Sequence, residues 1–573
     1  MEKRGGGIAG KIIALIFLVI SVAFAGMLVY TKMIPEQMLT IIGVCLLVLV
    51  FLVGILTWNR HHVIRFSIGT CLAVALSVVY ILGDVYVYKT TSTIAQISGV
   101  TTEIAQVGVY VRSDDKADSI ETAQKYNYGI LAELDRESTD GAVEQIKEEM
   151  GEDVTIQEYQ GLTDLIDALM HEETDVIVLN QAYMGVIEEM EGYSDVDSKI
   201  RQIDTKNIET VIETKASTRT ESQSFRQTEE SGNSSTQSTG SNDSDSTSNT
   251  DSTNNDTSPD NDKSVNETNS GSDSNENSGN SSKSDTDKNS SNDSESIKIS
   301  ENSSTSSQGT SVKEEKVYTI LISGIDNRGG IVAKSRSDVN IIATVNTATR
   351  QILLVSTPRD YFVPLSISNG VPDKLTHAGI YGISVCMDTL GMLYDIDINN
   401  YIRLNFDGFI KIIDALGGIT VNSEYDFDTD AHHFDKGENV VDGEAALAFA
   451  RERYAFASGD RQRGKNQMAV IKGVIDKILS PELLKNYSSI LSSVEGCFET
   501  NLSYDEIASL CQQQLSEGGS WNVVSYSVDG TGDSQQPYSM NQYAYVMVPD
   551  DTTVDHAKEL MAKVRGGEKI TQE

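Results

Sequence analysis

Three apolar runs near the N-terminus constrain this chain more than any other feature. They cover residues 12–30, 38–58 and 66–86, and each is close to the ~20 residues that a helix needs to cross a bilayer. A cleaved signal peptide is the alternative for the first run, but no small-residue cleavage site follows it and two further runs come directly after it. The sequence therefore predicts that residues 1–90 form a membrane anchor of three transmembrane helices.

Basic residues mark one side of these runs. Lys3, Arg4 and Lys11 precede the first run, and Arg60 and Arg65 lie in the short loop between the second and the third. Short loops rich in lysine and arginine stay in the cytoplasm. We therefore expect a multi-pass protein of the cell membrane whose N-terminus is cytoplasmic and whose bulk, after the third span, is extracellular.

Residues 101–215 alternate β-rich runs with amphipathic stretches. The runs at 107–112, 126–134, 154–159 and 175–180 are typical of strands, and 139–150 and 162–172 have the apolar spacing of helices. This alternation predicts a small extracellular α/β accessory domain with a largely parallel sheet. It is similar to half of an extracytoplasmic solute-binding domain, and a structural spacer or partner-docking module is the alternative.

Residues 216–315 consist mainly of Ser, Asn, Asp, Thr and Gly, with almost no large apolar side chains. Such a segment cannot bury enough apolar surface to offset the entropy of ordering, so it is predicted to be a disordered linker. A flexible coil of about 100 residues has an end-to-end distance of roughly 50 to 60 Å. The domain that follows could therefore move between the membrane surface and a cell wall.

Strand-like and helix-like patterns return in residues 316–573. The strand-like runs are 317–326, 338–346 and 351–360, and the helical stretches are 406–418, 442–453 and 460–479. The length is ample for a full core. We expect a mixed α/β domain with a central sheet flanked by helices, and a membrane-anchored α/β protein overall.

Two aspartates lie at facing ends of the first two predicted strands of this domain. Asp326 ends one strand and Asp338 begins the next, so neighbouring strands would bring both carboxylates to one rim of the sheet. Mg²⁺ binds one or two carboxylates and leaves its other positions to water and substrate phosphate. A turn with a solvated aspartate is the alternative for either residue alone.

Cations are concentrated in residues 451–467, which hold four arginines and one lysine in a chain of net charge −39. Arg451 and Arg453 share a side only if a helix ends there and the chain is extended. A helix that starts with Asp460 as N-cap places Arg463 and Gln467 one turn apart on one face. Together with the two aspartates, this set favours a pyrophosphate ligand, because arginine binds phosphate bidentately. Salt bridges with neighbouring carboxylates are the alternative.

Six segments resemble the signature blocks of the LytR-CpsA-Psr family: GID, RSDVN, STPRD, NNYIRLNFDGFIKIIDALGGITV, VDGEAALAFARERYAF and GDRQRGKNQ. The resemblance implies that Asp326 and Asp338 hold Mg²⁺. It implies that the pyrophosphate of a polyprenyl-linked glycan binds Arg336, Arg359, Arg451, Arg453, Arg463 and Gln467. Arg359, Asp326 and Arg453 are the expected catalytic residues.

Members of this family are expected to transfer a phospho-linked anionic glycopolymer, such as teichoic acid or capsular polysaccharide, from polyprenyl pyrophosphate to peptidoglycan. This Mg²⁺-dependent phosphotransferase reaction needs no nucleotide, and the chain has no GxxxxGK[ST] loop. Nucleic acid is an unexpected partner for so acidic a chain. A polyprenyl-pyrophosphate glycan hydrolase, and a membrane-anchored regulator or sensor without catalysis, remain alternatives.

Two smaller features stay open at this point. Cys497 and Cys511 lie fourteen residues apart in the external part, and they form either a disulfide or two buried thiols. His432 and His433 are adjacent among aspartates, but neighbouring side chains point apart and no second His or Cys pair stands at ligand spacing. We therefore expect a solvated loop there and no zinc site.

Overall fold

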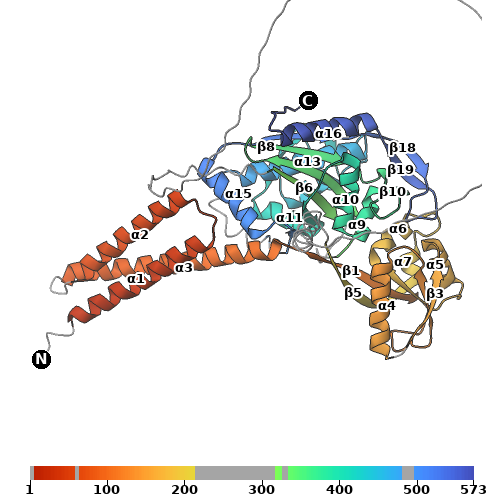
Figure 1. The fold of residues 1–573 in the computed structure, drawn as a ribbon, viewed down its shortest axis with the longest axis horizontal. Helices are drawn as coiled ribbons and strands as arrows, with labels where there is room; N and C mark the ends of the chain where they lie inside the picture. The colour runs from red at the N-terminus through yellow and green to blue at the C-terminus, as the bar shows by residue number, and fades with distance from the viewer. Residues whose placement is uncertain are drawn as a thin grey trace, which may run out of the picture. The chain divides into compact units, whose positions relative to one another are not determined.

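The computed structural model describes residues 6–58, 63–151, 153–212, 317–325, 333–480, 494 and 496–572 (Figure 1). Contacts group these residues into one unit, Met1–Gln227 with Glu314–Glu573. The predicted linker at 216–315 lies outside the described residues, as do Asp326 and the basic residues Lys3, Arg4 and Arg60. The proposed limits of the domains remain predictions.

The three apolar runs form helices, as predicted. They are α1 (Gly6–Tyr30), α2 (Glu36–Thr57) and α3 (Val63–Ile97). All three are long and apolar enough to cross a membrane. Helix α3 extends eleven residues beyond the predicted apolar run, so its last three turns carry the chain toward the first strand of the accessory domain.

The accessory domain has a five-stranded sheet in the order β3-β2-β4-β1-β5. Its elements are β1 (Thr102–Arg112), β2 (Asn127–Leu131), α4 (Arg136–Met150), β3 (Thr155–Tyr159), α5 (Leu162–Met170), β4 (Val176–Asn180), η1 (Gln181–Tyr183), α6 (Met184–Glu188), α7 (Val196–Lys199) and β5 (Ile200–Val211). The expectation of a largely parallel sheet is wrong in detail. Strand β2 pairs in parallel with β3 and β4, but β1 pairs antiparallel with β4 and with β5.

The C-terminal domain is built on a six-stranded sheet in the order β16-β11-β6-β7-β8-β17. The strands are β6 (Val317–Ile325), β7 (Ser337–Asn346), β8 (Gln351–Thr357), β11 (Asn400–Asn405), β16 (Phe498–Thr500) and β17 (Asn522–Ser527). The first three form an antiparallel meander. Strands β11 and β17 add to its two edges in parallel with β6 and β8.

Helices cover both faces of this sheet (Figure 1). Side chains of a strand point alternately to opposite faces, and in β8 Ile352 and Leu354 pack on one side while Leu353 and Val355 pack on the other. The first side is covered by α13 (Asp460–Ile478) and α15 (Tyr504–Glu517), and the second by α10 (Ile383–Tyr394) and α16 (Asp551–Arg565). Both strand faces are therefore buried, which explains the nearly continuous apolar runs of β7 and β8.

A second apolar core lies beside the sheet and includes the side chains of Ile413, Val421, Phe427, Phe449 and Val470. It joins α13 to α11 (Phe406–Ala415), α12 (Gly443–Arg451), β12 (Ile419–Ser423), β13 (Phe427–Asp428), β14 (His433–Phe434) and β15 (Gly437–Val441). The remaining elements are β9 (Phe362–Pro364), β10 (Pro372–Lys374), η2 (Leu375–His377), α9 (Ala378–Tyr381), β18 (Gly530–Gln535) and β19 (Ala544–Pro549). Cys497 and Cys511 are not joined by a disulfide.

Strand directions bring several chain segments to one rim of the sheet. Strand β6 ends at Ile325, which pairs with Ser337 at the start of β7 and with Asn405 at the end of β11. Strand β8 runs in the same direction as β6 and ends at Thr357. The carboxyl ends of parallel strands are where α/β sheets bind ligands, so this rim is the place to look for a site.

Candidate active site

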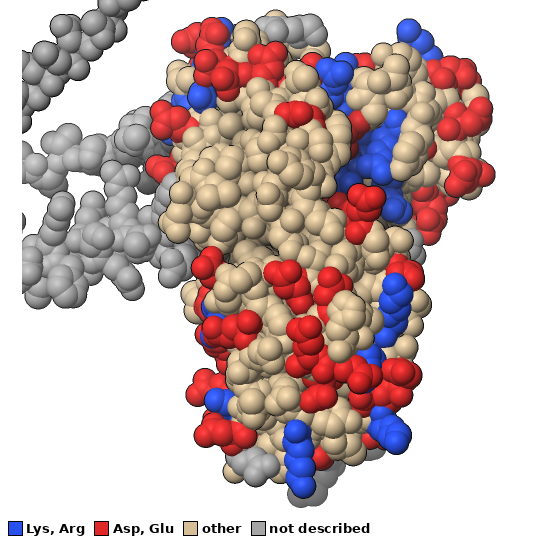
Figure 2. All heavy atoms as spheres, turned by 90° about the vertical axis from the view of Figure 1, so that its right-hand side faces the viewer, with Lys and Arg blue, Asp and Glu red and all other residues tan. Residues whose placement is uncertain are grey.

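A cavity of about 1030 Å³ opens between this rim and helices α11, α12 and α13. Its described lining residues come from β6, β7 and β11, from the turn after β8, from the three helices and from the loop between β13 and β14. Lysine and arginine side chains gather in one hollow of the surface shown in Figure 2. The arginines that line the cavity among the described residues are Arg359, Arg451, Arg453 and Arg463.

The end of α12 explains how two of these arginines reach the same cavity. The helix ends at Arg451, and Glu452 then has extended backbone angles (φ −63°, ψ 131°). In an extended chain, residues two apart lie on the same side, and Arg451 and Arg453 both line the cavity. The helix therefore ends, and the chain becomes extended, where Arg451 and Arg453 require it in order to share a side. The guanidinium of Arg453 also lies over the Tyr454 ring, 4.8 Å from its centroid.

Helix α13 contributes its first two turns. It begins at Asp460, one residue earlier than predicted, because Gly459 (φ +52°) takes the N-cap position that the sequence assigned to Asp460. Arg463 and Gln467 line the cavity from one face of the helix, as expected. The Arg463 guanidinium pairs with the Asp460 carboxylate at 2.5 Å. Burial raises the pKa of Asp460, although Arg463 opposes this.

Asp338 and Arg359 form the charged pair at the sheet rim. The Arg359 guanidinium donates to both Asp338 oxygens at 3.2 Å, and the Thr376 hydroxyl donates to Oδ1 at 2.9 Å. Burial alone would raise the pKa of Asp338, but the guanidinium groups of Arg359, Arg336 and Arg463 lower it below its ordinary value. Asp338 is therefore an anion at neutral pH in the wall of the cavity.

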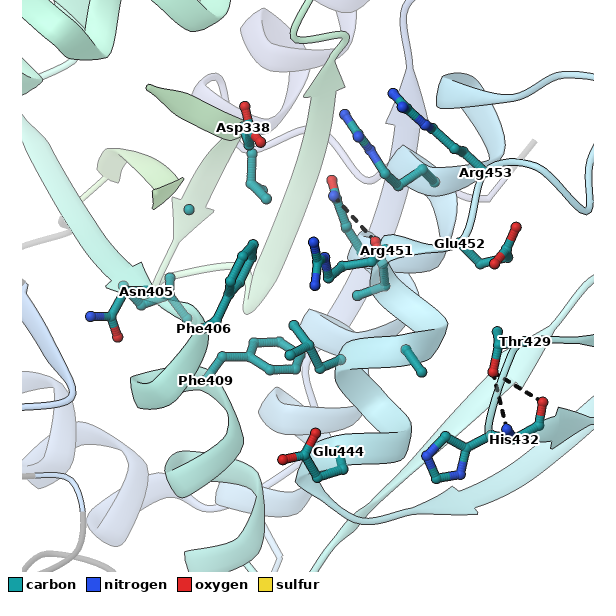
Figure 3. A pocket seen from close by; sticks show the side chains of 18 of the residues that line it. Asp338, Asn405, Phe406, Phe409, Thr429, His432, Glu444, Arg451, Glu452 and Arg453 are labelled. Carbon is teal, nitrogen blue, oxygen red and sulfur yellow. Dashed lines mark hydrogen bonds between the residues drawn. The ribbon is translucent and has the colours of Figure 1, made fainter. Parts of the chain in front are cut away.

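The cavity changes character along its length (Figure 3). Asp338 and Arg453 lie at one end, Phe406 and Phe409 in the middle, and Glu444 at the other end. The Arg451 guanidinium lies over the Phe406 ring at 4.4 Å from its centroid, which is close enough for a cation–π interaction. The site thus places a strongly cationic pocket directly beside an apolar channel.

The loop between β13 and β14 also lines the cavity. Thr429 and His432 line it, whereas His433 points away and pairs with Asp428 at 2.8 Å. The hydrogen bond to Asp428 raises the pKa of His433. A cluster of Asp426, His433 and Asp435 has ligand atoms within 4.8 Å of one another, but all three are exposed. The geometry agrees with a solvated loop.

The remaining predicted residues fare differently. Asp326 lies outside the described residues. Arg336 is not among the described residues that line the cavity, and its guanidinium donates to Glu189 of the accessory domain at 2.6 Å. Thr376 and Asn405 reach the site although the sequence did not single them out. The contact of Arg336 with phosphate and the metal role of Asp326 stay predictions.

Comparison of the chain with known proteins shows its family. The LytR_cpsA_psr family model matches residues 268–563, more than half of the chain. Polyisoprenyl-teichoic acid--peptidoglycan teichoic acid transferase TagU of Enterococcus faecalis is 36% identical over 230 residues, which cover 40% of this chain and 75% of the relative. TagU of Bacillus subtilis is 31% identical over 251 residues, covering 44% and 79%. The crystal structure of B. subtilis TagV is 27% identical with a TM-score of 0.38, covering 45% of this chain and 100% of that one.

Proposed function

Since this chain belongs to the LytR_cpsA_psr family, we propose that it transfers a phospho-linked anionic glycopolymer from a polyprenyl pyrophosphate carrier to peptidoglycan. The named activity of its TagU relatives supports the transfer of teichoic acid to peptidoglycan. Teichoic acid and capsular polysaccharide are the candidate polymers. The proposed enzyme is a phosphotransferase.

The observation that carries this proposal is the two-part cavity. A lipid pyrophosphate has a compact polyanion joined to a long hydrocarbon chain, and it needs a cationic pocket next to an apolar channel. Arg359, Arg453 and Arg463 supply the first part, and Phe406 and Phe409 begin the second. Phosphate oxygens accept paired hydrogen bonds from guanidinium groups, which a lysine cannot supply in the same fork geometry.

The proposed reaction joins an acceptor hydroxyl to the phosphorus that carries the glycan. The new P–O bond forms as the bond to the bridging oxygen of the pyrophosphate breaks, and polyprenyl monophosphate leaves with that oxygen. The hydroxyl proton passes to a base that the described residues do not identify. Negative charge grows on the leaving phosphate, and Arg359, Arg453 and Arg463 are placed to stabilise it.

Mg²⁺ fits this site on the chemistry of its donors. Mg²⁺ commonly binds one or two carboxylates and completes its octahedron with water and phosphate. Asp338 presents a carboxylate to the cavity with a lowered pKa, so it is deprotonated and able to bind a cation. We propose that Asp338 holds Mg²⁺ together with Asp326, and that the ion neutralises charge on the pyrophosphate.

Membrane placement follows the same proposal. The helices α1, α2 and α3 can each cross a bilayer, which would keep the catalytic domain close to a lipid donor. We propose that the domain faces the outside of the cell, where peptidoglycan is found. Basic residues before α1 and between α2 and α3 support a cytoplasmic N-terminus.

Donor cleavage gives a direct test of the site. The purified full-length chain in detergent micelles is incubated with Mg²⁺, a synthetic polyprenyl-pyrophosphate glycan and a peptidoglycan oligomer, and released polyprenyl monophosphate is measured. We expect Arg359→Ala to lower turnover by roughly 10²- to 10³-fold, as does the loss of one preorganised donor elsewhere. Chelation of Mg²⁺ should also stop release, and added Mg²⁺ should restore it.

Arg565→Ala is the matched control, because this arginine is exposed in the last turn of α16. Its turnover and melting temperature should equal those of the wild type. Arg359→Ala should stay folded with a lowered melting temperature, because Asp338 loses its ion-pair partner. A folded Arg359→Ala variant with near-normal turnover would remove the basis for this assignment.

A further inference from the structure

One carboxylate of the accessory domain, that of Glu189, contacts two cationic side chains of the catalytic domain, Arg336 and Lys374. Glu189, the C-cap residue that follows α6, accepts from the Arg336 guanidinium at 2.6 Å, and its other oxygen lies 3.3 Å from the Lys374 ammonium. Lys374 is nearly inaccessible, with 6% of its side chain exposed, and Arg336 is 15% exposed. Glu189 itself lies outside the 268–563 segment that matches the family.

From Lys374 a row of alternating charges leads to the cavity. The Lys374 ammonium lies 3.8 Å from the Asp360 carboxylate, which lies 3.6 Å from Nε of Arg359. Arg359 then pairs with Asp338 in the cavity wall. Every member of this row between Glu189 and Asp338 has a side chain at most 14% exposed. Such pairs are weakly screened by solvent, so a change at one end affects the other.

Electrostatics connect the two ends of the row as well. Burial would raise the pKa of Glu189, but Lys374, Arg336 and Arg359 together lower it. In turn Glu189, together with Asp338 and Asp360, raises the pKa of Arg359 above its ordinary value. Glu189 therefore acts on a guanidinium that faces the cavity although the two side chains are not in contact.

The accessory domain, which carries Glu189, is attached to the catalytic domain by further contacts. Arg403 of β11 is buried between Glu103 of β1 and Glu499 of β16, with a 2.8 Å contact to Glu103 and a 2.6 Å contact to Glu499. The backbone of Ile104 also pairs with Ala333, just before β7. Helix α6 is thus held by a domain that is anchored on the catalytic sheet at several points.

We propose that Glu189 is a positioning residue for the transfer reaction, through which the accessory domain holds Lys374 and Asp360 so that Arg359 keeps its place in the cavity. This inference rests on the proposed function for its kinetic consequence. Without the Glu189 charge, Asp360 is the one close carboxylate that the buried Lys374 ammonium keeps among the described residues, and the ammonium draws it away from Arg359. The displacement of Arg359 should slow the chemical step, because Arg359 stabilises the negative charge that develops on the leaving phosphate.

Glu189→Gln tests the idea with little change in shape. We expect kcat to fall roughly 10- to 100-fold, the range seen when outer partners of metal ligands are removed, while KM for the lipid donor changes little. Glu189→Asp keeps the charge and should recover part of the loss. Glu191→Gln is the matched control, because this exposed side chain lies two residues away and its backbone, not its carboxylate, bonds Gln542.

Hydrogen–deuterium exchange of the full-length protein in micelles gives a reading that does not depend on activity. Backbone amides of residues 357–376 should exchange faster in Glu189→Gln than in the wild type and in Glu191→Gln. Unchanged exchange overturns the proposal, and so does faster exchange with unchanged kcat. If exchange responds but the wild type shows no transfer, the coupling stands and the proposed function fails. Faster exchange with a lowered kcat in Glu189→Gln alone supports both.

Discussion

Arginine supplies every cation among the described residues that line the cavity. The choice matters because a guanidinium stays charged at any physiological pH and offers a planar fork of donors. Arg451 stacks on Phe406 where the cationic and apolar parts meet. The positive charge that these arginines give the site is therefore constant across the physiological pH range.

Asp338 gives a prediction about pH. Its pKa in the folded protein is lowered by Arg359, Arg336 and Arg463, whereas an unfolded aspartate has a pKa near about 3.9. A lowered folded pKa stabilises the fold above the unfolded value and loses this effect as pH falls through the folded value. The melting temperature of the wild type should therefore exceed that of Asp338→Asn by a constant amount from pH 8 to pH 5.

Below about pH 4 this difference in melting temperature should shrink as Asp338 becomes protonated. Melting of both proteins across the pH series, in one detergent, measures it. A difference that already disappears between pH 7 and pH 5 would mean that the carboxyl titrates near neutrality, contrary to a lowered pKa.

The sequence predicted the residues of the site best where they are close in the chain. Arg451, Arg453, Arg463 and Gln467 come from two neighbouring segments, and all four line the cavity. Helix periodicity placed Arg463 and Gln467 on one face, and the expected end of a helix placed Arg451 and Arg453 on one side. Arg336 is different, because its partner Glu189 is 147 positions away in another domain. No local pattern predicts such a pair, and Thr376 was missed for the same reason.

At the scale of the elements, helix α13 approaches its neighbours through two glycines. It packs so closely that a Cβ on Gly464 would lie 2.6 Å from Ser356 Oγ and one on Gly473 would lie 2.5 Å from the Thr420 carbonyl. Small residues at these positions let the helix approach β8 and β12. Its distance from the sheet in turn fixes where Arg463 and Gln467 enter the cavity.

Gly473→Ala should therefore destabilise the protein although alanine is the better helix former. The added methyl meets a backbone carbonyl that cannot move alone, and overpacking of this kind costs about 1–3 kcal/mol. Turnover should fall too, because a displaced α13 shifts Arg463. Thermal unfolding and donor cleavage measure the two effects.

Gly141→Ala in α4 is the control for this substitution. The atoms nearest to a methyl there are side-chain atoms of Ile208, at 3.3 Å and beyond, and these atoms can shift. The variant should be at least as stable as the wild type. Equal stability of the Gly473→Ala and Gly141→Ala variants would contradict the close packing of α13.

Element boundaries followed from the sequence where caps and periodicity agree. The strands β6, β7 and β8 and the helices α11 and α12 match their predicted ranges within a few residues. Strand β5 was missed, and with it the antiparallel half of the accessory sheet, because its run IRQIDTKNIETV is largely polar and half exposed. Pairing of β11 and β17 with the meander is a long-range property that propensity does not encode.

Three segments distant in the chain meet at Arg403, which is one of the points that join the accessory domain to the catalytic domain. Its side chain is 2% exposed and pairs with Glu103 of the accessory domain and Glu499 of the catalytic domain. Removing one member of a buried ionic group leaves uncompensated charge and costs about 3–5 kcal/mol. We therefore expect the accessory and catalytic domains to unfold in one transition when Arg403 is present and in separate transitions when it is removed.

Arg403→Ala should lower the melting temperature sharply and split one cooperative transition into two. Differential scanning calorimetry of the full-length chain measures this. Arg350→Ala is the control, since its pair with Glu517 is 28% exposed on both sides and exposed pairs contribute only about 0–1 kcal/mol. A single unshifted transition in Arg403→Ala would show that the domains are joined by other means.

The central claim, that this chain moves a glycopolymer from a lipid pyrophosphate to peptidoglycan, is tested most directly by the mass of the acceptor product. The full-length protein is incubated with Mg²⁺, the synthetic lipid donor and a peptidoglycan oligomer, and the oligomer is analysed by mass spectrometry. We predict an oligomer that carries the glycan through one phosphodiester, formed by the wild type and not by Arg359→Ala. Free phospho-glycan with an unmodified oligomer, or intact donor, would contradict the account.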